Sequence, residues 1–348
     1  MDYRDHPLNR DLTPDAKVQI YRQMVRIRRF EQEAMKYYIS GKMGGLLPLD
    51  IGQESISVGV RTLVGPEDHA ICGWRGIGHA LAAGMEMGPC MAELYGKAAG
   101  ASGGKGGAMS LFVPSNRFWG SYPIAGAQTP LAAGLAFALK LRGIQGAVIC
   151  FLGDGTVNQG VYHETLNLAG LFDLPVVFVI ENNRYAMGTS QERSSRFKEC
   201  LARRADTYDI AWDITGDGDL YELRARVGVL MERARRESKP AVIEIPTYRY
   251  FGFTVSDANH KKYRTPEEIE FMKQTRDPIT RWRQQLEAEG LMNDELANRV
   301  DAEAKVEAMQ ATGFAEAAPP PTVEDVMSNV YWETDHSTPA SKIGRHFF

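Results

Sequence analysis

Two patterns of apolar and polar positions alternate along the 348-residue chain. Short continuous apolar runs are typical of buried strands, and they lie at 68–74, 147–152, 174–180 and 241–250. Apolar residues at helical spacing predict helices at 15–41, 53–63, 126–142, 157–170, 219–237, 266–289 and 293–310. Strands that alternate with helices favour a mainly parallel sheet with helices on both faces. The pattern therefore predicts an α/β fold.

The chain is predicted to form one α/β domain over residues 1–348. A polar arm at 1–14 precedes the body at 15–316, and a tail at 317–348 begins in proline-rich sequence. The glycine-dense stretch at 96–107 could be a flexible linker. Apolar segments flank it on both sides, so we interpret it as a packed loop near the functional site.

Composition narrows the class of protein without naming a function. The formal net charge of −4 gives no electrostatic reason to expect nucleic acid or an anionic membrane as a partner. The four cysteines have no close pair, which indicates reduced thiols and not a disulfide framework or a zinc site. No apolar run reaches the roughly 18 residues that a membrane-spanning helix needs. We therefore expect a cytoplasmic protein without a membrane segment.

Candidate chemistry is concentrated after two of the predicted strands. Gly153-Asp154-Gly155 follows the strand at 147–152, and Asn183 follows the next strand, 29 residues after the aspartate. Neighbouring parallel strands bring their carboxyl ends to one edge of a sheet, where ligands bind. A carboxylate, an amide oxygen and a backbone carbonyl at Tyr185 suit Mg²⁺, whose shell substrate phosphates complete.

The two glycines would let a diphosphate approach the backbone, and a helix predicted to begin near Val157 would offer free N–H groups. The alternative is an ordinary strand–turn–helix corner whose Asp154 only caps the helix. The matching position of Asn183 favours a Mg²⁺ and diphosphate site, and thiamine diphosphate as its cofactor.

Several segments resemble one family. GDGTVNQG and ENNRYAMGTS are similar to motifs of the α subunits of thiamine-diphosphate-dependent 2-oxoacid dehydrogenase E1 components, and further matches cover roughly residues 18–285. Those matches are IGQES, PEDHAICGWRGIGH, MAELYGKAAGASGGKGGAMSLF, IAGAQTPLAAG, TYRYFGFTVSD and YRTPEEIE. The resemblance implies the thiamine-diphosphate-binding fold and a separate β subunit, usually in an α2β2 heterotetramer with the cofactor at the interface. It also implies C–C cleavage of a 2-oxoacid or related ketone, followed by transfer of the acyl unit.

The resemblance assigns roles to individual residues. Asp154, Asn183 and Tyr185 would ligate the metal. The residues implied to bind the cofactor are Trp74, Arg75, Pro123, Ala125, Gly153, Asp154, Gly155, Thr156, Asn183, Tyr185 and Met187. Trp74 and Arg75 stand where the family has a Tyr-Arg pair that contacts the phosphates, and Pro123 and Ala125 where its backbone meets the aminopyrimidine.

The chain departs from the family pattern at four positions that commonly carry histidine. Pro48, Ile77, Phe251 and Phe253 stand there, whereas His79 keeps its histidine. We therefore take His79 and the Phe253 position as the candidate catalytic positions. Imidazole can donate and accept protons near neutral pH, and proline, isoleucine and phenylalanine cannot.

Three functions remain open at this point. The first is an E1-type enzyme that passes its acyl unit to a lipoyl-bearing E2 protein. The second is a decarboxylase or carboligase with an apolar pocket that works without E2. The third is a non-catalytic scaffold subunit that binds the cofactor or a β-like partner.

Overall fold

The computed structural model describes residues 2–216 and 218–328, so most of the predicted tail at 317–348 lies outside the described residues. The strands are β1 His69–Gly73, β2 Phe118–Tyr122, β3 Val148–Gly153, β4 Val176–Asn182, β5 Tyr185–Ala186, β6 Thr189–Ser190, β7 Ala211–Ile214 and β8 Ala241–Pro246. The α-helices are α1 Pro7–Arg10, α2 Pro14–Ile39, α3 Glu54–Arg61, α4 Ile77–Ala82, α5 Met87–Leu94, α6 Gln128–Leu141, α7 Gly160–Leu171, α8 Gln191–Ser194, α9 Leu220–Glu237, α10 Pro266–Arg276, α11 Pro278–Ala288 and α12 Asp294–Ala317. The 3₁₀ helices are η1 Tyr3–Asp5, η2 Gly107–Met109, η3 Pro114–Asn116, η4 Thr156–Asn158, η5 Ala202–Tyr208, η6 His260–Lys262 and η7 Glu324–Met327.

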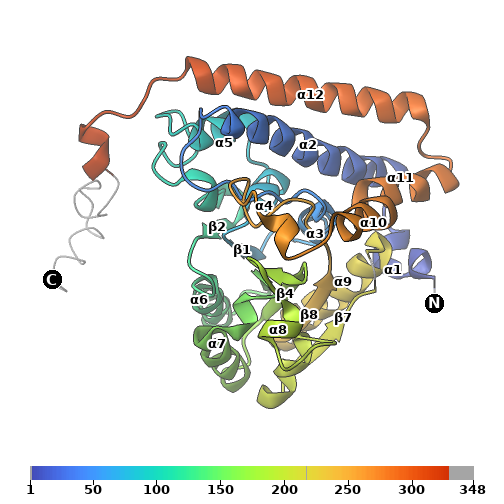
Figure 1. The fold of residues 1–348 in the computed structure, drawn as a ribbon. Coiled ribbons are helices and arrows are strands. Elements are labelled where there is room, and N and C mark those ends of the chain that lie inside the picture. The colour runs from blue at the N-terminus through green and yellow to red at the C-terminus, as the bar shows by residue number, and fades with distance from the viewer. Residues whose placement is uncertain (1, 217, 329–348) are drawn as a thin grey trace.

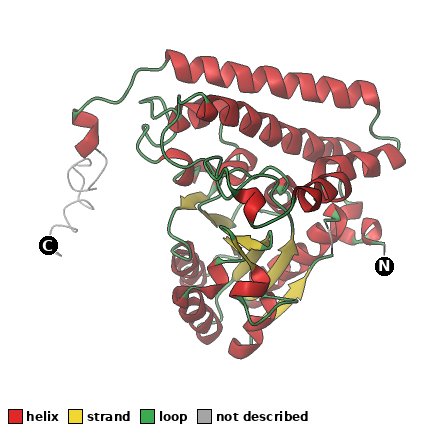
Figure 2. Ribbon diagram, in the orientation of Figure 1, coloured by secondary structure: helices red, strands yellow, loops and turns green. Residues whose placement is uncertain are grey.

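A parallel sheet forms the centre of the molecule (Figure 2). Its strand order is β2-β1-β3-β4-β8-β7, and every neighbouring pair is parallel. Alternate side chains of the inner strands enter two separate cores: Ile149 and Val177 face one, and Cys150 and Phe178 face the other. Because both faces are buried, these strands are continuous apolar runs. The predicted α/β fold with a mainly parallel sheet is confirmed.

Helices cover the two faces of the sheet unequally (Figure 1). Helices α6 and α7 lie together on one face, and α3 and α9 cover the other. The long helices α2 and α12 lie side by side in a further layer. Helix α2 begins as the sequence predicts, because Thr13 caps it by accepting a hydrogen bond from the Ala16 N–H at 3.2 Å.

The N-terminal arm contains helical turns and packs against the rest of the protein through a buried residue. Residues of the polar arm form η1 and α1, and Asn9 is buried against α9, where it donates to the Tyr221 carbonyl at 2.7 Å. Among the described residues, no helix is both long and apolar enough to span a membrane.

The structure corrects three predicted elements and contains strands that were not predicted. The helix predicted at 266–289 is two helices, because Asp277 is extended and caps a new helix that starts at Pro278. The strand predicted to reach residue 250 leaves the sheet after Pro246. The helix predicted at 157–170 begins instead as the 3₁₀ turn η4, and its α-helical part starts at Gly160. Strands β2 and β7 were missed altogether.

Candidate cofactor and metal site

A cavity of about 600 Å³ opens at the carboxyl edge of the sheet. Its walls come from the segments that follow β1, β2, β3 and β4, from the loop after β8, and from single residues of other loops. Twelve of the thirteen residues predicted for the site line this cavity, namely Trp74, Arg75, Pro123, Ala125, Gly153, Asp154, Gly155, Thr156, Asn183, Tyr185, Met187 and Phe253. The structure thus brings together segments that lie far apart in the sequence.

Asp154 is the most unusual polar group of the cavity. It is 5% exposed, and its Oδ2 atom has no hydrogen-bond partner among the described residues. Burial raises the pKa of its carboxyl group to about 6. An unpaired buried carboxylate oxygen is costly, and a bound cation would remove that cost. The environment of Asp154 therefore fits a metal ligand.

Gly155 allows two loops of the site to meet. Its φ and ψ of −71° and −30° suit any residue, so its role is steric. A Cβ atom at Gly155 would lie 2.5 Å from the Cβ of Ala186. The turn after β3 and the turn at 184–187 can therefore touch only because position 155 has no side chain.

The turn after β4 presents the second candidate ligand. Arg184 and Met187 have positive φ of 72° and 53°, which bends the chain sharply around Tyr185. The Asn183 Oδ1 atom accepts a hydrogen bond from the Tyr185 N–H at 3.3 Å. The Tyr185 hydroxyl donates to Glu268 at 3.0 Å, so the phenol is already engaged outside the metal site. If Tyr185 ligates a cation, its backbone carbonyl is therefore the group available to do so.

Arg75 places a buried cation at the cavity wall. Its guanidinium donates to the backbone carbonyl of Leu49 and to that of Phe253, the latter at 3.2 Å. It also lies 5.2 Å from the centre of the Trp74 ring, and that ring is 6.0 Å from the ring of Phe253. Arg75 thus joins two loops and offers positive charge beside an apolar surface.

His79 and the four positions that commonly carry histidine in the family do not all lie at the cavity. His79 is buried behind the wall and does not line the cavity; its Nε2 atom lies 3.0 Å from Glu181 Oε1. Although burial opposes a charged imidazole, the Glu181 carboxylate raises the pKa of His79. Of the four substituted positions, only Phe253 lines the cavity, whereas Pro48, Ile77 and Phe251 do not. None of the described residues that line it is histidine.

The glycine-dense stretch is a packed loop, as the flanking apolar segments indicate. The buried carboxylate of Glu93 accepts four backbone hydrogen bonds, from Ser102 and Gly104 at 2.8 Å, from Gly106 at 2.7 Å and from Gly107 at 2.9 Å. The loop ends in η2, whose Met109 lines the cavity. Glu93 therefore holds the loop in the shape that delivers Met109.

Four polar residues of the cavity were not predicted from the sequence, namely Gln53, Gln128, Gln159 and Glu181, and two of them contact predicted residues. Gln53 lies at the start of α3, inside the segment IGQES, and its Oε1 accepts a hydrogen bond from Asn183 Nδ2 at 3.1 Å. Glu181 directly precedes the two asparagines at the end of β4, and it carries the contact to His79. For both Gln53 and Glu181, the available signal in the sequence was a polar side chain within or beside a segment already identified as a motif.

The site defines the protein as a parallel-sheet protein with a pocket at its carboxyl edge, lined by the buried carboxyl group of Asp154 and the buried guanidinium of Arg75. The family model of the dehydrogenase E1 component matches residues 22–324. The chain is 39% identical over 332 residues to the pyruvate dehydrogenase E1 component subunit alpha of Zymomonas mobilis, covering 92% of this chain and 93% of that protein. The proteins of the same name from Rhizobium meliloti and Rickettsia bellii are 36% and 38% identical, over 92% and 90% of this chain and 91% and 95% of theirs.

The chain therefore belongs to the dehydrogenase E1 component family, among its α subunits. This is a family of thiamine-diphosphate-dependent 2-oxoacid dehydrogenases. Two observations fit such a cofactor independently of the family: the unpaired Asp154 oxygen suits a cation, and the buried Arg75 guanidinium suits an anion in the same cavity.

Proposed function

We propose that this chain holds the Mg²⁺ ion and the diphosphate of thiamine diphosphate in an E1 enzyme that cleaves a 2-oxoacid. The observation that carries the proposal is the unpaired, buried oxygen of Asp154 beside Asn183 and Arg75 in one cavity. Asp154, the amide oxygen of Asn183 and the carbonyl of Tyr185 would hold the cation, which prefers oxygen ligands. Arg75 would bind the diphosphate.

When bound, thiamine diphosphate supplies the nucleophilic carbon for the 2-oxoacid carbonyl and the electron sink for loss of its carboxylate. This chain's own residues would surround that chemistry with an apolar wall. Trp74, Met109 and Phe253 line the cavity, and they would exclude water from it. Arg75 joins the loop of Phe253 to the diphosphate end, so anion binding and the position of that wall would be linked.

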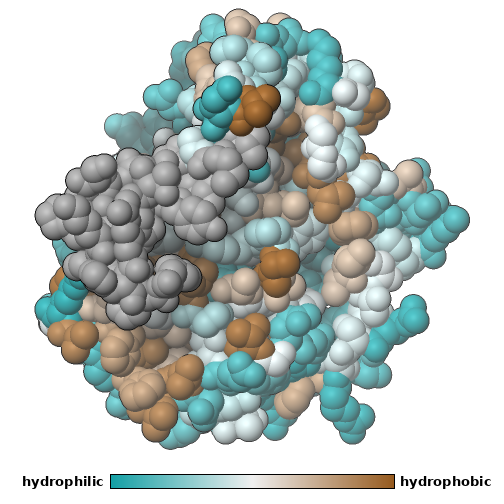
Figure 3. Space-filling model, turned by 90° about the vertical axis from the view of Figure 1, so that its left-hand side faces the viewer, coloured by the Kyte–Doolittle hydropathy of each residue, from teal (hydrophilic) through white to brown (hydrophobic). Residues whose placement is uncertain are grey.

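A β subunit, in an α2β2 heterotetramer, is the partner that we propose. The relatives are named as subunits, and two adjacent helices of this chain expose apolar side chains. In Figure 3 apolar side chains gather low on the face where α6 and α7 lie in Figure 1. The exposed apolar residues of these helices and the turns beside them are Ile124, Leu131, Phe137, Leu141, Leu168, Leu171 and Phe172. Surfaces of this kind mark contacts with other proteins.

A decarboxylase or carboligase that works without E2 is the second candidate, favoured by one observation. No histidine is among the described residues that line the cavity, and Phe253 occupies its wall. Acyl transfer to a lipoyl group needs proton transfers that phenylalanine cannot perform. A lipoyl-bearing E2 acceptor is thus a feature to be tested separately from the cofactor.

The test uses the chain co-expressed with the β subunit of its own genome. Titration calorimetry with thiamine diphosphate, with and without Mg²⁺, should give binding that depends on the metal. Release of CO₂ from 2-oxoacids and reduction of an added lipoyl domain then separate the E1 reaction from the E2-independent one. Absence of cofactor binding would leave a scaffold subunit and would overturn the proposal.

A further inference from the structure

Gln53 makes a contact with Asn183 that bears on how the metal is held. Gln53 is 3% exposed, lines the cavity and stands 130 positions from Asn183 in the sequence. Its Oε1 atom accepts a hydrogen bond from Asn183 Nδ2 at 3.1 Å. The opposite end of that amide, Oδ1, accepts from the Tyr185 N–H at 3.3 Å. Both ends of the Asn183 amide are therefore defined by neighbours.

Only one end of an asparagine amide can ligate a cation. Oδ1 has two lone pairs, so it can accept the Tyr185 N–H and still face a metal, whereas Nδ2 carries two hydrogens. A half-turn of the Asn183 amide would place a donor toward the cation and oppose two N–H groups at the Tyr185 contact. With Gln53 in its present orientation, it would also set two oxygens against each other at the Gln53 contact. The Gln53 acceptor and the Tyr185 N–H therefore act together to favour the orientation of Asn183 in which its oxygen is available.

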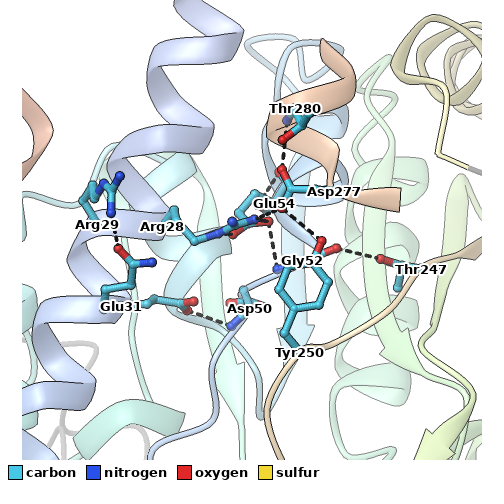
Figure 4. A network of polar contacts seen from close by, with 12 residues as sticks. Arg28, Arg29, Glu31, Asp50, Gly52, Glu54, Thr247, Tyr250, Asp277 and Thr280 are labelled. Carbon is cyan, nitrogen blue, oxygen red and sulfur yellow. Dashed lines mark hydrogen bonds and ion pairs between the residues drawn. The ribbon is translucent and has the colours of Figure 1, made fainter. Parts of the chain in front are cut away.

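The residues on either side of Gln53, Gly52 and Glu54, belong to a network of polar contacts that holds this part of the backbone (Figure 4). The neighbouring Glu54 is fully buried and forms an ion pair with Arg28 of α2, and its Oε2 accepts from the Gly52 N–H at 3.0 Å. Arg28 also reaches Asp277 Oδ2 at 3.0 Å, and the Tyr250 hydroxyl donates to the same oxygen at 3.0 Å. This network ties the start of α3 to α2 and to the start of α11.

We propose that Gln53 is a positioning residue that orients the amide of Asn183 for a divalent cation. The proposal rests on the proposed function, because it assumes that a metal binds at Asp154 and Asn183. Metal-bound residues are commonly held by such outer partners, and loss of one typically lowers metal affinity by about 10–100-fold.

The chain contains a matched control for this contact. Asn182, next in sequence, donates from Nδ2 to Gln191 Oε1 at 2.8 Å, and its Oδ1 accepts from the Arg184 N–H at 2.9 Å. Asn182 and Gln191 are buried to a similar degree, at 5% and 8% exposed, but neither lines the cavity. A Gln191→Met variant loses the same kind of amide contact at a place where no cation is expected.

The experiment measures Mn²⁺ affinity by electron paramagnetic resonance in the co-expressed α/β complex with thiamine diphosphate present. Gln53→Met keeps the size of the side chain and removes both amide groups, and it should weaken Mn²⁺ binding by about tenfold or more. Gln53→Glu keeps an acceptor for Asn183 Nδ2, and its affinity should stay closer to that of the wild type. Gln191→Met should bind Mn²⁺ like the wild type.

A double-mutant comparison tests the route of the effect. If Gln53 acts through Asn183, then Gln53→Met should change nothing further in an Asn183→Ala background. Gln53→Ser serves as a second variant, because serine is a good helix N-cap but is too short to reach Asn183. Thermal unfolding of each complex confirms that it is folded.

The outcomes separate the two proposals. Wild-type Mn²⁺ affinity in both Gln53→Met and Gln53→Ser, or an undiminished effect in the Asn183→Ala background, would overturn the role of Gln53 and leave the proposed function standing. Failure of the wild-type complex to bind Mn²⁺ would instead overturn the proposed function.

Discussion

Gly155→Ala is a test of whether the two loops around the proposed metal site must touch. The backbone of Gly155 is in the helical region, so alanine fits its conformation and only the added Cβ matters. That atom would lie 2.5 Å from the Cβ of Ala186. Carbon atoms in contact prefer about 3.5–4.0 Å, so the loops must part by about 1 Å. Overpacking of this kind costs about 1–3 kcal/mol, and a shift of about 1 Å in a site can cost about 100-fold in function.

A second substitution, which removes the Cβ of Ala186, should relieve the clash that Gly155→Ala creates. In the double variant Gly155→Ala with Ala186→Gly, the closest remaining atom is the Cα of residue 186 at 3.5 Å, an ordinary contact. The double variant should therefore recover most of the Mg²⁺-dependent cofactor affinity that Gly155→Ala loses. Gly160→Ala is the control, because a Cβ there meets nothing within 4 Å.

The assay is titration calorimetry with thiamine diphosphate and Mg²⁺, accompanied by thermal unfolding of each variant. We expect Gly155→Ala to bind at least tenfold more weakly than wild type, and Gly160→Ala to bind normally. Full affinity in Gly155→Ala would refute the steric argument. Equal losses in Gly155→Ala and in the double variant would show that the glycine is needed for something other than its contact with Ala186.

Three further predictions concern the charged and apolar walls. Burial raises the pKa of Asp154 to about 6, whereas the carboxyl group of an unfolded aspartate has a pKa of about 3.9. As the pH rises from about 4 through about 6, the cofactor-free protein therefore loses about 3 kcal/mol of stability. Asp154→Asn should therefore raise the unfolding temperature of the cofactor-free protein at pH 7.5, lose that gain as pH falls from 6 toward 4, and abolish Mg²⁺-dependent binding in calorimetry. Arg75→Lys keeps the charge but cannot bridge the carbonyls of Leu49 and Phe253, so its affinity for thiamine diphosphate should fall; unchanged affinity would contradict the bridging role. Phe253→His should make turnover of 2-oxoacids depend on pH near 6.5, whereas Phe253→Leu should not; identical pH profiles would contradict the assignment of this wall position.

The inner strands could be predicted because both of their faces are buried, and the edge strands could not. β3 and β4 are continuous apolar runs whose side chains enter a core on each face of the sheet. β7 at one edge is only half-buried along its length, so it has no such run. β2 at the other edge contains Gly120 at a φ of 93°, and its pairing with β1 shifts register. Their strand character comes from pairing with a neighbour, which sequence pattern does not reveal.

The sequence spacing between Asp154 and Asn183 predicted the part of the site that two adjacent strands form. It did not predict the residues that reach the site from distant segments. Asp154 and Asn183 follow neighbouring parallel strands, so their proximity follows from the strand order. Gln53 reaches the same place from the start of a helix through tertiary packing. His79 lies on α4 and is buried outside the cavity lining, where it pairs with Glu181.

The ionisable side chains of the cavity restrict how protons can move in the proposed reaction. Arginine stays protonated at any working pH, so Arg75 serves as a fixed charge. Burial and the Glu268 contact raise the pKa of Tyr185 to about 12, and Asp154 is assigned to the cation. Among the described residues that line the cavity, Glu181 is then the remaining acid–base side chain, and its partner His79 is shielded from the cavity. Proton transfers of the proposed reaction would therefore fall to Glu181, to the ring of the cofactor and to groups of the proposed β subunit.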